Sequence, residues 1–155
     1  MAARNPTSRA LGNLLVALQF LLLAALALAA AYAVDYGPIP AVVWALGLGG
    51  IALGLWAVTC NRPGNFNIHP EPRARGQLVV HGPYRWIRHP MYTAVIAIAA
   101  ACATLVGAGW AWLCVAALIA VLVVKATLEE RALLGVHRDY GDYRARTKRF
   151  LPWIV

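Results

Sequence analysis

Two short polar stretches lie against long apolar runs and hold the side chains best suited to chemistry. The first, the 82–92 motif, is Gly82-Pro83-Tyr84-Arg85-Trp86-Ile87-Arg88-His89-Pro90-Met91-Tyr92. The second, the 125–131 motif, is Lys125-Ala126-Thr127-Leu128-Glu129-Glu130-Arg131. Ionisable groups at the edge of a membrane are energetically costly and mark a functional site by default. We therefore treat the two motifs together as one candidate site.

The residue types of the motifs suit a ligand that carries both charges and an aromatic ring. Arg88 and His89 can hold a carboxylate, whereas a glutamate in the 125–131 motif can bind an ammonium or hydroxyl group. Tyr84 and Tyr92 offer stacking surfaces and hydroxyl groups. Adjacent helical positions differ by about 100°, so one of the two glutamates can face inward and the other outward.

The composition places this site in a membrane protein. The chain has 155 residues, of which 61% are hydrophobic and 13% charged, and its mean hydropathy is +0.63. A membrane-spanning helix needs about 20 apolar residues, and the run from Met91 to Val124 is too long for one helix. A hinge at Gly107-Ala108-Gly109 would divide it. The sequence thus predicts an all-α integral membrane protein with four spans, at about 11–34, 40–60, 91–106 and 109–128.

The basic residues give the predicted orientation. All 14 lie before residue 11, between 61 and 90, or from 125 onward, and the other two turns between spans have none. Because cytoplasmic segments collect Lys and Arg, we expect both termini, the 61–90 loop and a C-terminal helix and tail at 129–155 to be cytoplasmic. We expect the protein to lie in the cell (inner) membrane. The net charge of +8 then follows from this topology and from contact with membrane lipids, so nucleic acid is not an expected partner.

Several features have a simpler interpretation. The glutamates could form surface ion pairs with Lys125 or Arg131, and the arginines alone could be topology markers. Ala31-Tyr32-Ala33 resembles a signal-peptide cleavage site, but the preceding apolar run is long, which favours a retained helix. The Gly50-x-x-x-Gly54 step predicts close helix packing. No strand precedes Gly47-x-Gly49, so no Rossmann domain is expected.

Neither the cysteines nor the histidines indicate a metal site. The three cysteines lie in or beside spans, and we interpret them as packing residues. His69, His81 and His137 stand singly without ligand spacing, so no metal is expected.

The motifs resemble the isoprenylcysteine carboxyl methyltransferase family. The resemblance is carried by Gly82-Pro83-Tyr84-x-x-x-Arg88-His89-Pro90-x-Tyr92, Glu129-Glu130, Gly135-x-x-x-x-Tyr140-x-x-Tyr143 and Leu151-Pro152. It covers about residues 60 to 155, and the related phospholipid methyltransferases share much of it. The family implies S-adenosylmethionine bound at the cytoplasmic face, with S-adenosylhomocysteine as the product.

Carried over by position, the resemblance implies a role for each site residue. The cofactor would contact Gln77, Leu78, Val79, Tyr84, His89, Pro90, Met91, Tyr92 and Glu129. His89 would hold the methionine carboxylate of the cofactor, and Glu129 a hydroxyl or ammonium group. Lys125 stands where the eukaryotic enzymes have an arginine for the substrate carboxylate, with Arg88 as a second cation on the substrate side. Glu130 is the one obvious nearby base.

The methyl acceptor is left open by these residues. Lys125 keeps the positive charge of the family's arginine but lacks the planar guanidinium that binds a carboxylate with two hydrogen bonds, which weakens the inference of a carboxylate. The richness in Ala and Arg is typical of a bacterial chain, in which prenylated cysteine termini are not expected. The leading hypothesis is methyl transfer to a lipid-like or small apolar carboxylate or thiol that enters sideways from the bilayer. The alternatives are a phospholipid amine N-methyltransferase and a non-catalytic small membrane protein.

Overall fold

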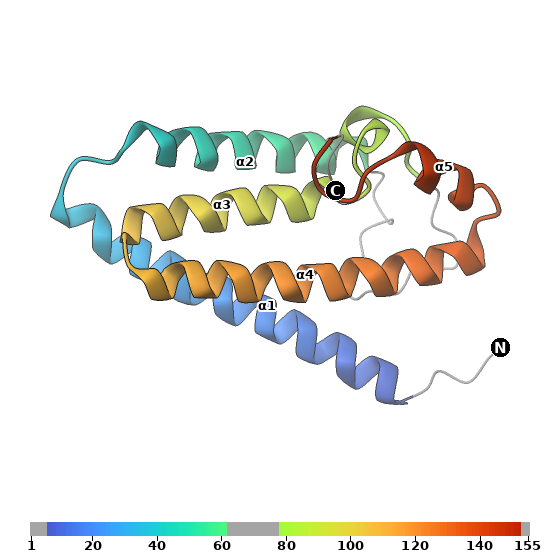
Figure 1. Cartoon of the computed structure of the whole chain (residues 1–155), viewed down its shortest axis with the longest axis horizontal. Coiled ribbons are helices and arrows are strands. Elements are labelled where there is room, and N and C mark those ends of the chain that lie inside the picture. The colour runs from blue at the N-terminus through green and yellow to red at the C-terminus, as the bar shows by residue number, and fades with distance from the viewer. Residues whose placement is uncertain (1–5, 62–77, 153–155) are drawn as a thin grey trace.

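The chain folds into helices that run side by side (Figure 1). The structure, a computed structural model, describes residues 6–61 and 78–152. Its elements are α1 (Pro6–Ala33), η1 (Val34–Tyr36), α2 (Ala41–Cys60), η2 (Gly82–Arg85), α3 (Pro90–Val106), α4 (Gly109–Val136) and α5 (Tyr140–Arg146). The described residues contain no strand, only an isolated bridge between Ile87 and Lys148. The predicted all-α class is confirmed for this part of the chain.

Glycine and proline set the boundaries of the helices near the site. Pro90 occupies the first turn of α3, where its missing N–H is not needed for the helix. Gly107 ends α3 with φ of 69°, a left-handed conformation that favours glycine, and α4 begins at Gly109. The predicted hinge therefore lies where the sequence places it. α4 continues to Val136, eight residues past the predicted end of the fourth span at 128.

Three helical segments are long and apolar enough to cross a membrane, as judged by length and composition: Arg9–Ala33, Ala41–Cys60 and Gly109–Val136. α3 is also apolar but has 17 residues. Large apolar side chains, including Leu14, Leu28, Leu55 and Leu113, are exposed on the flanks of α1, α2 and α4. A soluble protein rarely exposes so much contiguous apolar surface, whereas lipid-facing helices do.

α3 packs closely against α2 at a glycine-lined seam. A Cβ atom at Gly50 would lie 3.0 Å from the carbonyl oxygen of Ala94 and 2.8 Å from a side-chain carbon of Ile98. A Cβ atom at Gly54 would lie 3.5 Å from the Cβ atom of Ala94. The Gly50-x-x-x-Gly54 step thus brings two helix backbones together, and the packing role predicted for it is confirmed.

α3 also contacts α1 and α4, and these three helices share the core. The core cluster joins residues of α1, α3 and α4: Leu26, Ala99, Ala103, Ala111, Val115, Leu118 and Leu122. The small side chains on α3 let the larger ones of α1 and α4 fill the space between the helices.

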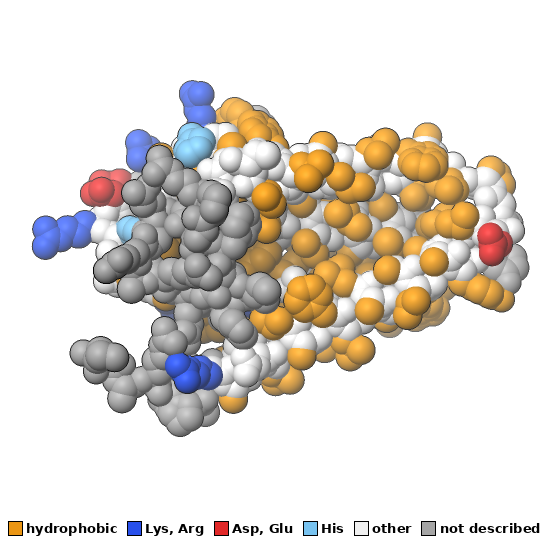
Figure 2. All heavy atoms as spheres, turned by 180° about the vertical axis from the view of Figure 1, so that it is seen from behind, with side chains coloured by type: hydrophobic (Ala, Val, Ile, Leu, Met, Phe, Trp, Pro, Cys, Tyr) orange, Lys and Arg blue, Asp and Glu red, His pale blue; other side chains and the backbone are white. Residues whose placement is uncertain are grey.

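The polar groups gather at one end of this bundle. α1 begins and α4 ends at this end, and η2 and α5 lie there as well (Figure 1). In the space-filling view, basic side chains stand at this end, whereas orange apolar side chains cover the length of the helices (Figure 2). With 28 residues α4 is about 42 Å long, more than the roughly 30 Å of a hydrocarbon layer. Its last turns therefore extend beyond an apolar layer that contains its first turns.

Candidate functional site

The 82–92 motif is anchored to the end of α2 by Gly82. This residue has φ of +59°, and a Cβ atom on it would lie 2.3 Å from the sulfur of Cys60. The positive φ disfavours an L side chain there, and the side chain of Cys60 would have to move to make room for a Cβ atom. The next residue, Pro83, is buried, and the ring of Trp86 packs edge-on against Trp56 of α2 at 5.9 Å. These contacts fix where the chain enters the site.

The closing segment, Thr147 to Pro152, folds back along the 82–92 motif. Arg88 N–H donates to the carbonyl of Lys148 at 2.8 Å, and His89 N–H to that of Arg149 at 3.1 Å. Lys148 N–H in turn donates to the carbonyl of Trp86 at 3.0 Å. The hydroxyl of Thr93 donates to the carbonyl of Phe150 at 2.7 Å. The closing segment and the start of α3 thus form one wall of the site.

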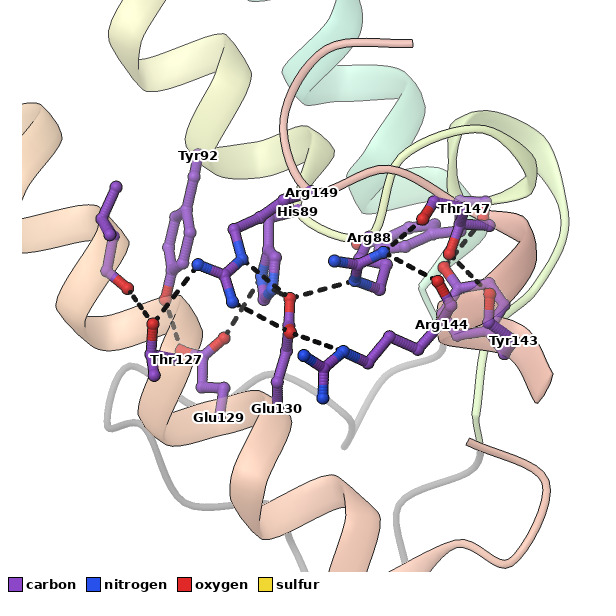
Figure 3. Close-up of polar contacts among 12 residues, drawn as sticks. Arg88, His89, Tyr92, Thr127, Glu129, Glu130, Tyr143, Arg144, Thr147 and Arg149 are labelled. Carbon is purple, nitrogen blue, oxygen red and sulfur yellow. Dashed lines mark hydrogen bonds and ion pairs between the residues drawn. The ribbon is translucent and has the colours of Figure 1, made fainter. Parts of the chain in front are cut away.

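The carboxylate of Glu130 is the centre of the polar contacts (Figure 3). Its side chain, 2% exposed, accepts hydrogen bonds from Arg88 Nε at 3.0 Å and from Arg149 Nε and Nη2, both at 3.1 Å. His89 Nε2 lies 3.2 Å from the same carboxylate, and Arg144 Nε 3.6 Å from it. Glu130 therefore joins α4, the start of α3 and the closing segment through ionic contacts.

These contacts argue against the base role expected for Glu130. A carboxylate that is held by several guanidinium groups favours its charged form and has little tendency to take up a proton. Its lone pairs already accept hydrogen bonds from Arg88, His89 and Arg149. The geometry instead fits a positioning residue, because removal of Glu130 would leave these buried cations without a counter-ion.

Arg88 is also engaged within the protein. Besides the bond to Glu130, its Nη1 donates to the backbone carbonyls of Arg144, at 3.2 Å, and Thr147. Its side chain is largely buried. Arg88 therefore ties the 82–92 motif to the C-terminal segment, and its expected role as a second cation for the substrate stays a prediction.

His89, Tyr92 and Glu129 form the second group of contacts. The hydroxyl of Tyr92 donates to Glu129, and the rings of His89 and Tyr92 stack at 5.3 Å with an interplanar angle of 4°. His89 Nδ1 lies 3.5 Å from Glu129, and Phe150 covers the imidazole at 5.9 Å. Both glutamates thus contact His89.

Lys125 lies one helical turn before Glu129, on the side of α4 that faces α1. Its ammonium donates to Gln19 Oε1 at 2.6 Å and lies 5.3 Å from the centre of the Tyr92 ring. The side chain of Lys125 is 2% exposed. Tyr92 therefore contacts both Lys125 and the group formed by His89 and Glu129.

The other predicted cofactor contacts lie around this group. Tyr84, in η2, accepts at its carbonyl a hydrogen bond of 2.8 Å from the hydroxyl of Tyr143. Burial and the nearby Cys60 and Glu129 raise the pKa of the Tyr84 hydroxyl to about 12, so the hydroxyl is neutral at pH 7. The remaining predicted contacts in the described part of the chain are Pro90, buried at the start of α3, and the partly buried Met91, Leu78 and Val79. Gln77 lies outside the described residues.

Sequence reasoning missed three contributors to the site. Arg149 and Arg144 belong to a run of basic residues that the orientation rule already explains, so neither stands out. Gln19 did give a signal, because it is a polar residue in the middle of the first apolar run. Nothing in the sequence, however, connects it with Lys125, from which it is separated by 106 positions.

Comparison with known protein families matches residues 43–135, more than half of the chain, to the isoprenylcysteine carboxyl methyltransferase (ICMT) family. The matched range runs from α2 to the last turn of α4 and includes both motifs. α1, α5 and the closing segment lie outside it. Searches of curated proteins and of solved structures gave no match.

Proposed function

Since the chain belongs to the isoprenylcysteine carboxyl methyltransferase family, we propose that it is a membrane methyltransferase that uses S-adenosylmethionine. The acceptor in this proposal is a lipid-like or small apolar molecule with a carboxylate or thiol. The observation that carries the proposal is the meeting of the two motifs at one end of the bundle, where His89 and Tyr92 contact Glu129. Residues 37 or more positions apart thus build one polar site beside apolar helices.

The proposed topology has four spans, with the site on the cytoplasmic side of the inner membrane. The 17 residues of α3 extend about 25 Å, close to the thickness of the hydrocarbon layer, and α3 packs between α2 and α4. Polar ends and local thinning of the bilayer accommodate a slightly short helix. The basic residues at the polar end support the cytoplasmic assignment, because Lys and Arg collect on that side.

The side chains present fit the parts of S-adenosylmethionine. Glu129 keeps 21% of its side chain exposed and suits the ammonium or a ribose hydroxyl. The aromatic ring of Tyr84 and the apolar Leu78 and Val79 suit the adenine ring, whereas the ring of Tyr92 is already stacked on His89 and faces Lys125. Pro90 and Met91 extend the same apolar lining. His89, which now faces two glutamates, would serve the methionine carboxylate only after a shift of its ring.

The mechanism requires little acid or base chemistry from the protein. When bound, S-adenosylmethionine supplies an electrophilic methyl group on a sulfonium. Lys125 would hold an acceptor carboxylate through its ammonium, which leaves the other carboxylate oxygen free to attack in line. A carboxylate has no proton to lose, so the site needs no general base. Holding the two reactants in line is worth up to about 7 to 11 kcal/mol of the barrier.

The same geometry disfavours transfer to a phospholipid amine. A protonated amine must lose a proton before it can attack, and this step needs a base. The expected base, Glu130, is ion-paired with Arg88 and Arg149. A carboxylate or thiolate acceptor fits the site without this difficulty.

Titration of S-adenosylmethionine into the detergent-solubilised protein tests the proposal. We expect saturable binding, weakened at least tenfold by Glu129→Gln, because a charge-assisted hydrogen bond contributes about 1.5 to 3 kcal/mol. Asp142→Asn makes the same chemical change at an exposed position of α5 and should leave the affinity unchanged. Absence of saturable binding, in a preparation shown to be folded, would favour the non-catalytic alternative.

A further inference from the structure

The 82–92 motif has an outer face as well as the inner face that lines the site. His89 is buried, whereas Arg85 and Trp86 are exposed. The ring of Trp86 packs edge-on against that of Trp56 at 5.9 Å, and the guanidinium carbon of Arg85 lies 6.0 Å from the centre of the Trp86 ring. We call Trp56, Arg85 and Trp86 the indole surface. Trp56 is 45% exposed and Trp86 44%, so much of each ring is left for another partner.

The indole surface lies at the depth of a membrane interface. Trp56 is about 22 Å from the start of α2 at Ala41, and the whole helix is about 30 Å long, which matches the thickness of a hydrocarbon layer. At the opposite end of the bundle, where α2 and α4 begin, three other tryptophans are exposed: Trp44, Trp110 and Trp112 (Figure 1). Tryptophan collects at both interfaces of a membrane. The indole surface is thus the aromatic belt of the polar end.

Arg85 adds a positive charge to this belt. Within residues 6–61 and 78–152 it forms no salt bridge, and a guanidinium over an indole ring keeps its N–H donors for other acceptors. A second exposed cation, Lys148, adjoins the surface, because its backbone N–H donates to the carbonyl of Trp86 at 3.0 Å. Guanidinium groups bind phosphate oxygens through two parallel hydrogen bonds. At the depth of an interface, the group that offers such oxygens is the phosphate of a phospholipid.

We propose that the indole surface is a binding site for the head group of an anionic phospholipid. The guanidinium of Arg85 holds the phosphate, and the two indoles lie against the glycerol and the first carbons of the acyl chains. The choline of a zwitterionic lipid would bring a positive charge toward Arg85 and Lys148, which disfavours it. The bound lipid fixes the depth of the 82–92 motif in the membrane, because this surface and the site residues belong to the same short segment.

A belt of tryptophans without a lipid site makes a different prediction. Such a belt anchors the protein in any bilayer, so the charge of the lipid would not matter. A general attraction of the basic end to anionic lipid would depend on its other arginines as well. Arg138 separates these cases, because it is exposed and follows the end of α4, about 12 Å beyond a layer that begins with α4. It therefore lies too far from the belt to share a head group with Trp86.

The test titrates the detergent-solubilised full chain with phosphatidylglycerol and with phosphatidylcholine of the same acyl chains. Native mass spectrometry measures the dissociation constant of the first bound lipid. We expect phosphatidylglycerol to bind about fivefold more tightly, which is the effect of one basic residue near an anionic head group. Arg85→Gln should reduce this preference to less than twofold. Arg138→Gln is the matched control, since it removes an exposed arginine of the same end, and should retain the preference.

The inference would be overturned by equal affinity of the native protein for the two lipids, or by an Arg85→Gln protein that keeps the preference. An equal loss with Arg138→Gln would show only a general attraction to the basic end. Displacement of the lipid by glycerol 3-phosphate would show that the surface takes a free phosphate ester instead. If Arg85→Gln fails to fold, Arg85→Lys, which keeps the charge but not the two-pronged donor, should lower the preference. None of these results depends on methyl transfer, so the proposed function is tested separately.

Discussion

Replacement of Glu130 by glutamine should destabilise the protein rather than only remove a catalytic group. Glutamine keeps the shape of the side chain and one oxygen acceptor, but it removes the negative charge that Arg88, His89 and Arg149 share (Figure 3). The start of α3, the end of α4 and the closing segment all depend on this carboxylate. Without its charge, the cations that face it remain buried and uncompensated.

The structure allows the size of this effect to be worked out. Breaking a buried ion pair by removal of one partner costs about 3 to 5 kcal/mol. The low end applies here, because Arg149 is 23% exposed and Arg144 49% exposed, so water screens part of their charge. We expect Glu130→Gln to lower the free energy of unfolding by about 3 kcal/mol, which is more than a hundredfold in the equilibrium constant.

Unfolding of the detergent-solubilised protein by sodium dodecyl sulfate, followed by circular dichroism, measures this effect. Asp142→Asn serves again as the control for an exposed acid and should change the stability by less than about 0.5 kcal/mol. The double variant with Arg149→Met should be less destabilised than the sum of the single variants, by at least about 1 kcal/mol, because the two side chains are in contact.

One outcome would refute this reasoning. If Glu130→Gln had native stability and native affinity for S-adenosylmethionine but no methyl transfer, the ionic contacts would be incidental. Glu130 would then be the general base that its position in the sequence first indicates.

Three further predictions concern other parts of the site. Gly82→Ala should destabilise the protein by 1 kcal/mol or more, seen in the same denaturant assay, because of its left-handed backbone and the contact with Cys60; native stability would show that the loop adapts. The free energy of unfolding should fall as pH rises from about 10 toward 12, because Tyr84 stays protonated in the folded protein while its hydroxyl in the unfolded chain ionises near pH 10. The substitution Tyr84→Phe should lessen the pH dependence of the unfolding midpoint. Lys125→Ala should spare S-adenosylmethionine binding, measured by titration, and impair transfer to an anionic acceptor; loss of cofactor binding would contradict the division of roles.

Much of the helical architecture could be predicted because it depends on local properties of the chain. The apolar runs and the glycines at the hinge place the helices to within a few residues, and Gly50 and Gly54 identify the close contact with α3. α4 extends past its predicted end because its last turns are polar, and hydropathy does not detect a helix outside the apolar layer.

The meeting of the two motifs could be predicted, but the contacts of their individual side chains could not. The resemblance brings the two motifs together. The carboxylate of Glu130, however, acts as a base or as a counter-ion according to its neighbours. One of these neighbours, Arg149, reaches Glu130 only because the closing segment folds back. Backbone groups hold that segment against Arg88 and His89, so its side chains carry little information about the pairing. Gln19 was missed for a related reason, since a contact between distant helices has no sequence spacing.

The most direct test of methyl transfer uses S-adenosylmethionine with a radiolabelled methyl group, the purified protein and a total membrane extract, followed by base treatment of the products. An ester releases volatile methanol in base, whereas N-methyl and S-methyl products do not. The account predicts protein-dependent label that is released as methanol and is lost with Lys125→Ala. Label that resists base would contradict the carboxylate acceptor, and no label, from a preparation that binds S-adenosylmethionine, would contradict methyl transfer to any molecule in the extract.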